Sequence, residues 1–412
     1  PGDVAAQLPT VWLFLAVWVA GGLYALLGAI SMAELATMMP RSGGQYVYAQ
    51  RALGSYAGFV VGWSDWIGTC GSTALVSMVI GEYAGALIPA LATRGKAVAV
   101  FVTVAFALLQ WRGVRWGSST QKLTTLLKAL AFIALIAACF ALGSGGSFNE
   151  SGALPPAVNP SLMVALILSL QAVIYTYDGW TGVIYFSEEV REPARDIPRS
   201  LLGSVLSVIV IYLLVNIALL YVLPLAEMAG QNLAAGAAAQ KIFGAHGDTI
   251  IRSLTIISLL SSINALHLMA TRVVFAMSRD ELFTSRVVRV NQGGTPTVAL
   301  FISTLVAVIF ILSGTFNIVI AVLAFFFVAS YAISFTSLFV LRRREPDAPR
   351  PFRAWGYPWT TALALLCSIA FLVGAILSDT ENSRYALLLL AASYPAFMLM
   401  KLAAGKGRSR SR

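Results

Sequence analysis

Residues 161–190 read "SLMVALILSLQAVIYTYDGWTGVIYFSEEV", an apolar run long enough to cross a membrane, with Asp178 and Gly179 near its middle. A charge in the hydrocarbon core is costly and a glycine weakens a helix, so two unfavourable residues lie together near the middle of the membrane. A helix that breaks at the midplane leaves free carbonyl groups that can receive an ammonium group, and free N–H groups that can receive a carboxylate. The pattern therefore predicts a broken membrane helix that forms part of a binding site for a zwitterion such as an amino acid.

The rest of the chain has the composition of a membrane protein. Of the 412 residues, 58% are hydrophobic and 11% are charged, whereas soluble domains carry about 25% charged residues. Apolar runs of about 20 residues predict membrane spans. Eleven such spans lie near residues 11–38, 55–90, 97–112, 123–142, 161–187, 201–224, 249–277, 297–313, 316–341, 359–378 and 385–402. The expected fold class is an all-α polytopic membrane protein.

The distribution of positive charge predicts the orientation. If the first full span runs from outside to inside, 22 of the 28 Lys and Arg residues lie on the inner side and five on the outer side, and Lys128 lies within a span. This asymmetry predicts a multi-pass protein of the cell inner (plasma) membrane with a cytoplasmic C-terminus. The net charge of +10 is thus a topology signal, and nucleic acid is not an expected partner. Residues 403–412 are expected to form a basic cytoplasmic tail that contacts membrane lipid.

Enzyme chemistry finds little support in the sequence. The cysteines Cys70, Cys139 and Cys367 fall within spans, and none has a partner at metal-ligand spacing. His246 and His267 have no neighbours in the sequence that would suggest a metal site or a catalytic triad. We therefore expect no enzyme activity, no metal and no cofactor.

Five ionisable residues lie in or near the spans. Glu34 and Glu82 are close enough to span ends that we expect them to be hydrated. Asp65 has two equal interpretations, a hydrogen-bonding group between helices or a transport residue. Lys128 lies too deep to reach the inner surface easily, so a pairing or functional role is favoured. Asp178 belongs to the predicted break.

Several long stretches occur in an order shared with a known family. They are "AELATMMPRSGGQYVYAQRALG" at residues 33–54, "YTYDGW" with "SEEVREPARDIPRSL", "NALHLMATRVVFAMSRDELF" and "LRRREPDAPRPFRAWGYP". Together these stretches are distributed over nearly the whole chain. They resemble the amino acid–polyamine–organocation superfamily, and within it the bacterial relatives of the L-type amino acid transporters.

The resemblance implies a LeuT-like inverted repeat of five plus five helices, followed by two C-terminal helices. Residues 1–402 would then form a single transmembrane transporter domain. Its parts are 1–142 (the remainder of the first repeat, helices 1b–5), 161–341 (helices 6–10) and 359–402 (helices 11–12). By this count the first half of helix 1, with the family's glycine-rich break, is missing from the chain, and residues 1–9 correspond to the outer half only.

The resemblance also implies site residues. Tyr175 would gate the site from outside, and the backbone carbonyls of Tyr175, Thr176 and Asp178 would hold the substrate ammonium group. The substrate-binding residues expected in all are Tyr175, Thr176, Tyr177, Asp178, Gly179, Thr69 and Thr73. Lys128 corresponds to a lysine that takes the place of a sodium ion, and it would tether helix 1 to helix 8 through Ser261 or Ser262.

The predicted function is sodium-independent transport of amino acids by alternating access, most simply exchange of neutral L-amino acids. A cationic amino acid or polyamine antiporter and a proton-coupled amino acid symporter stay open as alternatives, and so does a non-transporting channel or receptor-like protein. Eukaryotic L-type relatives are tethered to a heavy chain through a cysteine in the loop between helices 3 and 4. The corresponding loop here, "PALATRGKA", has no cysteine, so we expect no disulfide-linked heavy chain.

Overall fold

The computed structural model of the chain describes residues 1–112, 115–143, 145, 162–313 and 316–409. Within these ranges no β-strand occurs, and Val290 and Pro296 form one isolated bridge. The helices of the N-terminal part are α1 (Gly2–Gln7), α2 (Val11–Met38), α3 (Tyr46–Leu53), α4 (Ser55–Leu87), η1 (Pro89–Leu91), α5 (Gly95–Arg112) and α6 (Arg115–Leu142). Those that follow are α7 (Leu162–Tyr177), η3 (Trp180–Glu189), α8 (Pro193–Val222), α9 (Leu225–Met228), α10 (Ala234–Phe243), η4 (Gly244–His246), α11 (Gly247–Arg279), η5 (Ser285–Val288), α12 (Thr297–Ser313), α13 (Phe316–Arg344), α14 (Trp359–Ser378) and α15 (Thr380–Ser409).

The long apolar helices confirm an all-α polytopic membrane protein. Among the described residues, nine helical segments are long and apolar enough to cross a membrane, and two shorter apolar helices lie at Ala129–Leu142 and Thr297–Ser313. Together they cover all eleven predicted spans. The division into inverted repeats, with its boundaries after residues 142 and 341, stays a prediction.

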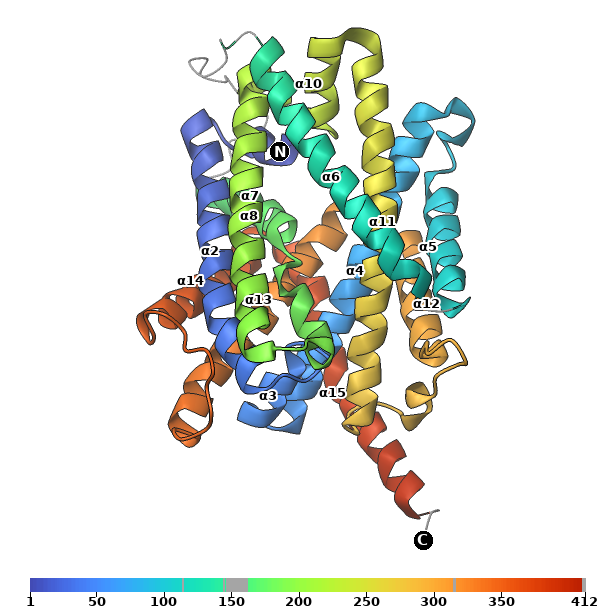
Figure 1. Cartoon of the computed structure of the whole chain (residues 1–412), viewed down its shortest axis with the longest axis vertical. Coiled ribbons are helices and arrows are strands. Elements are labelled where there is room, and N and C mark those ends of the chain that lie inside the picture. The colour runs from blue at the N-terminus through green and yellow to red at the C-terminus, as the bar shows by residue number, and fades with distance from the viewer. Residues whose placement is uncertain (113–114, 144, 146–161, 314–315, 410–412) are drawn as a thin grey trace.

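Helices from distant parts of the sequence pack side by side (Figure 1). α4 packs along α11 and also contacts α5, α12 and α13, while α2 packs against α8, α7 and α14. α13 is the most buried of the long spans, because α3, α4, α7, α14 and α15 all contact it. The short helix α1 lies against α7 and α9. The break in the span that begins with α7 therefore sits inside the bundle, with α2, α13 and α14 around it.

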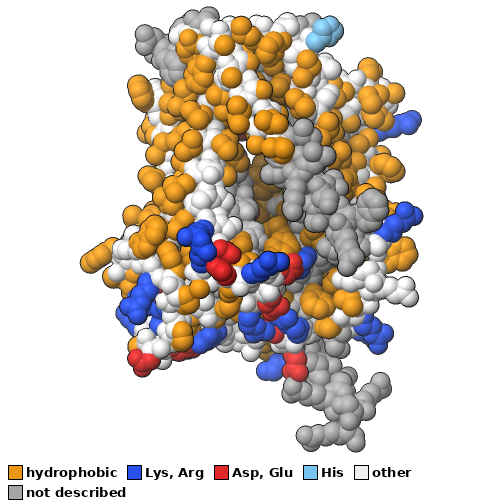
Figure 2. All heavy atoms as spheres, viewed as in Figure 1, with side chains coloured by type: hydrophobic (Ala, Val, Ile, Leu, Met, Phe, Trp, Pro, Cys, Tyr) orange, Lys and Arg blue, Asp and Glu red, His pale blue; other side chains and the backbone are white. Residues whose placement is uncertain are grey.

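The two ends of the molecule differ in charge. Hydrophobic side chains cover the upper part of the face in Figure 2, whereas Lys, Arg, Asp and Glu gather toward the lower end, where α3 lies in Figure 1. We call this the charged end and define it by the ion-paired residues Arg41, Arg51, Arg272, Arg279 and Arg342. The apolar belt above it is the surface expected where side chains face lipid.

Candidate functional site

The span at residues 161–187 is interrupted where the sequence predicts. α7 ends at Tyr177, Gly179 has a φ of 105° and a ψ of −9°, and the 3-10 helix η3 begins at Trp180. The N–H of Asp178 donates to the carbonyl oxygens of Ile174 at 3.0 Å and of Tyr175 at 3.2 Å, which closes the last turn of α7. The left-handed backbone at Gly179 is the conformation that glycine adopts most readily. The break thus follows from the residue type at one position.

The carboxylate of Asp178 ties this break to α13. Its Oδ1 accepts a hydrogen bond from the hydroxyl of Tyr331, whose ring lies 5.3 Å from that of Trp180 between centroids. Trp180 in turn packs over Gly28 of α2. Tyr331 lies in an apolar run, so sequence reasoning had no signal to single it out. Asp178 therefore contributes to the site through its side chain, as a link between helices, as well as through its backbone.

Two of the carbonyl groups predicted to hold an ammonium group already accept hydrogen bonds. The carbonyl oxygen of Thr176 accepts from the Tyr212 hydroxyl at 3.0 Å, and that of Tyr175 accepts from the Asp178 N–H. A carbonyl oxygen has two lone pairs, so each group can accept a second donor. The Thr176 hydroxyl donates to the carbonyl oxygen of Ala172 at 2.6 Å. Tyr177 is buried, with its ring against those of Trp18 and Tyr212.

Tyr175 and the predicted pocket residues of α4 lie close together. The ring of Tyr175 stacks on Phe327 of α13, with centroids 6.5 Å apart and an interplanar angle of 13°. Its side chain hydrogen-bonds with Ser72, which lies between Thr69 and Thr73 on α4. Both threonines are buried, and their hydroxyls donate to the carbonyl oxygens of Asp65 and Thr69 respectively. Sequence reasoning missed Ser72, although it belongs to the same small-residue run, "GTCGST".

The structure does not test the predicted tether through Lys128. Lys128 is on α6, and its side chain lies outside the described residues. α6 packs against α11, which carries Ser261 and Ser262. Ser261 is buried, and the hydroxyl of Ser262 donates to the carbonyl oxygen of Ser258 at 3.3 Å. The helices are therefore neighbours, as the tether requires.

The prediction for Glu34 was wrong, whereas that for Glu82 is confirmed. Glu34 is fully buried and receives two 2.6 Å bonds from the guanidinium of Arg342. It also pairs with Arg350 at 3.2 Å and accepts the N–H of Ala354 at 2.7 Å. A buried carboxylate is stable only with such partners, and they lie more than 300 residues further along the chain, outside any local pattern. Glu82 is exposed and accepts from the side chain of Asn232.

Ion pairs hold the charged end together. Arg272 binds Glu189 and Arg279 binds Glu188, each at 2.6 Å, which joins α11 to the end of η3. Arg41 binds Asp280 at 2.7 Å, which joins the loop between α2 and α3 to the end of α11. The contacts link three segments that are distant in sequence, so the charged end is closed in this structure.

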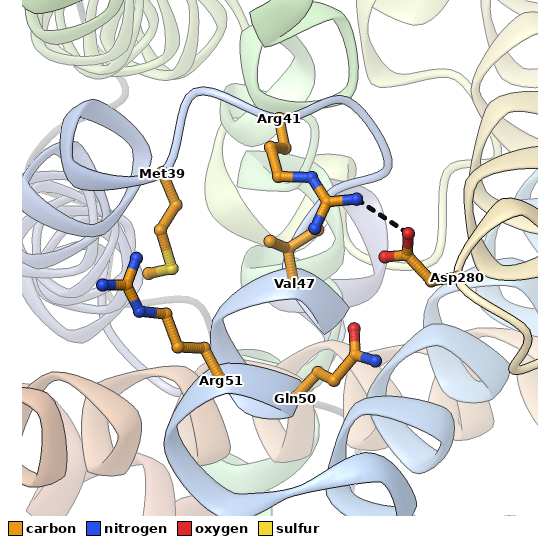
Figure 3. A pocket seen from close by; sticks show the side chains of 6 residues that line it. All are labelled: Met39, Arg41, Val47, Gln50, Arg51 and Asp280. Carbon is orange, nitrogen blue, oxygen red and sulfur yellow. Dashed lines mark hydrogen bonds and ion pairs between the residues drawn. The ribbon is translucent and has the colours of Figure 1, made fainter.

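A pocket of about 370 Å³ opens at this end beside the loop between α2 and α3. Figure 3 shows Arg41 paired with Asp280, Val47 next to the end of the Arg41 side chain, Gln50 below, and Met39 and Arg51 at the left. Asp280 also accepts a hydrogen bond from Tyr46 at 3.1 Å. Burial raises the pKa of the Tyr46 hydroxyl, and the neighbouring Asp280 carboxylate raises it further, so this hydroxyl stays protonated as a donor.

Comparison with known proteins identifies the family of the chain. The sequence profile of the amino acid permease family matches residues 2–394. The chain is 28% identical over 411 residues to the serine/threonine exchanger SteT of Bacillus subtilis (strain 168), covering 97% of this chain and 91% of that protein. It is 26% identical to the b(0,+)-type amino acid transporter 1 of Mus musculus, covering 92% and 78%. It is 28% identical to the Asc-type amino acid transporter 1 of the same species, covering 86% and 68%.

These relatives are transporters rather than enzymes, and the similarities cover between 86% and 97% of this chain. The resemblance seen in the motifs is confirmed at the level of the superfamily. The three relatives named above are amino acid transporters. The chain belongs to the amino acid permease family of the amino acid–polyamine–organocation superfamily.

Proposed function

We propose that the chain is a sodium-independent exchanger of neutral L-amino acids that works by alternating access in the cell inner membrane. The observation that carries this proposal is the interruption after Tyr177. It brings carbonyl ends of α7 and N–H groups of η3 to one depth inside the bundle, where they can bind the two charges of an amino acid backbone. We propose further that the charged end and the C-terminus face the cytoplasm, in accord with the positive-inside rule.

The side chains near the break support a neutral substrate over a cationic one. Asp65 and Asp178 are the residues that favour a cationic amino acid or a polyamine in the sequence, and their carboxylates accept hydrogen bonds from Tyr185 and Tyr331 respectively. Ser72 lies beside Tyr175 and carries no charge, and neither do its neighbours on α4, Thr69 and Thr73. Together with the similarity to a serine/threonine exchanger, this makes serine and threonine the first substrates to test.

Counterflow in proteoliposomes tests the proposal. Vesicles loaded with unlabelled serine should accumulate labelled serine at the same initial rate in sodium and in choline buffer. Competition by alanine, leucine, arginine and putrescine then gives the substrate class. Saturable uptake that requires internal amino acid supports exchange. Uptake that needs sodium, or that only arginine or putrescine competes, would replace this proposal by one of the alternatives.

A further inference from the structure

Asp65 is a buried carboxylate with a hydrogen-bond donor at only one of its two oxygens. It lies on α4 with 4% of its surface exposed. Its Oδ1 accepts a hydrogen bond from the Tyr185 hydroxyl of η3 at 2.6 Å. Its Oδ2 has no hydrogen-bond partner, and none of the ion pairs found in the described part of the chain includes this residue. Burial of an ionised carboxylate without a cation is strongly unfavourable.

The elements around Asp65 bring no positive charge to it in the described structure. One turn before it, Met277 of α11 packs on Gly62, and one turn after it, Phe327 of α13 packs on Gly68. The next residue of α4, Trp66, donates to the hydroxyl of Ser303 on α12. All of these neighbours are neutral.

Two titratable groups face Asp65 in the described part of the chain. They are the Tyr185 hydroxyl and, at longer range, the carboxylate of Asp178. A second carboxylate disfavours ionisation of the first. With one donor and no cation, a protonated Asp65 suits this environment better than a charged one.

The loop between α2 and α3 covers the free oxygen. Gly44 has a φ of 86°, and a Cβ added to it would lie 3.0 Å from Oδ2 of Asp65 and 2.8 Å from the Tyr185 ring. The loop is held in place by the Arg41–Asp280 pair and by the Ser42 hydroxyl, which accepts the N–H of Glu188 at 3.3 Å. Tyr185 lies one turn before Glu188 on η3. The segments that cover Asp65 are thus the same ones that close the charged end.

We infer that Asp65 is a proton-binding site whose occupancy is coupled to closure of the charged end, with the proton carried on Oδ2. The O–H bond forms when a proton from water at the charged end joins Oδ2, while Oδ1 keeps its bond from Tyr185. The bond breaks, and the proton returns to that water, when the loop at residues 39–45 moves away and hydrates the carboxylate. The pocket lined by Arg41 and Asp280 lies beside this loop (Figure 3) and is large enough to hold water.

A dependence on pH follows, and it rests on the proposed exchange function. Every exchange cycle has to close the charged end, and closure requires a neutral Asp65. Serine counterflow should therefore fall several-fold as the pH, set equal on both sides of the vesicles, is raised. Asp65→Asn keeps the shape of the neutral carboxyl and cannot ionise, so its counterflow rate should not vary with pH. Glu82→Gln is the matched control, since Glu82 is an exposed carboxylate at the other end, and it should follow the wild-type profile.

Infrared difference spectra between acidic and alkaline buffer test the site without transport. Among the bands of its other carboxyl groups, the reconstituted chain should show a C=O stretching component that Asp65→Asn lacks and Glu82→Gln retains. Tyr185→Phe should move this band to higher frequency, because Oδ1 loses its hydrogen bond.

The outcomes separate the two proposals. Counterflow by no amino acid at any pH would remove the exchange function, while the infrared band would still decide whether Asp65 binds a proton. If Asp65→Asn keeps the wild-type pH profile, or keeps the infrared band, the proton site is wrong. It is also wrong if Asp65→Asn abolishes only the competition by arginine, since Asp65 would then bind a substrate cation.

Discussion

Gly179 determines the geometry of the break through its backbone rather than through the space around it. Its φ is 105°, and a Cβ placed on it would meet no atom within 4 Å. Gly179→Ala therefore adds no clash and isolates the conformational penalty, about 1–2 kcal/mol for a residue with a side chain. We expect a lower thermal unfolding temperature and a large loss of counterflow. Gly182→Ala is the control, because Gly182 also has open space but no positive φ; equal effects of the two substitutions would contradict this account.

Removal of the Tyr331 hydroxyl should show how strongly Asp178 links the break to α13. Tyr331→Phe leaves the ring contact with Trp180 in place and removes only the hydroxyl that donates to Asp178. A hydrogen bond to a charged group contributes roughly 1.5–3 kcal/mol, and a neutral one roughly 0.5–1.5 kcal/mol. Tyr24→Phe, which breaks the neutral bond to Ser368, should thus destabilise less. Thermal unfolding of the two purified variants gives the order, and a reversed order would show that the Asp178 link is weak.

At the scale of elements, the contact between α6 and α11 carries the prediction about sodium. If the ammonium group of Lys128 takes the place of a sodium ion, serine uptake should be unchanged when choline replaces sodium. Lys128→Ala should lose most uptake while the protein still inserts, because the tether between helices is gone. Lys128→Arg should restore little, since a planar guanidinium does not fit where a compact charge was bound. Lys96→Ala, on the exposed surface of α5, serves as the control, and wild-type uptake by Lys128→Ala in choline would refute the hypothesis.

The helices could be predicted from the sequence far better than the contacts between them. Membrane thickness determines the length of an apolar run, so hydropathy located every span, and the coincidence of Asp178 with Gly179 located the break. Glu34 was misjudged because nearness to a span end says nothing about Arg342, which packs against it from another helix. The roles of Ser72 and Tyr331 were missed for a similar reason. The sequence of an apolar run does not show whether a hydroxyl within it faces a binding site or a neighbouring helix.

At the scale of the whole molecule, the positions of the cysteines bear on assembly. Cys70 and Cys139 are buried, and Cys367 is exposed on α14, within a membrane span. A disulfide to a second subunit needs a thiol in an aqueous loop, so we expect the protein to migrate at the same mass with and without reductant on gels of native membranes. A heavier band that disappears on reduction and contains a second polypeptide would contradict this expectation. Treatment of the same membranes with an amine-reactive cross-linker controls for partners held without a disulfide.

The partners of Glu34 have a consequence for the timing of synthesis. Arg342 follows Glu34 by 308 residues, and a ribosome that adds about 5–20 residues each second needs roughly 15–60 s to cover that interval. Throughout this period the nascent chain holds Glu34 near the end of α2 without the guanidinium group that later pairs with it. The helix that carries Glu34 can therefore complete its ion pairs only after the much later helix α13 has been synthesised.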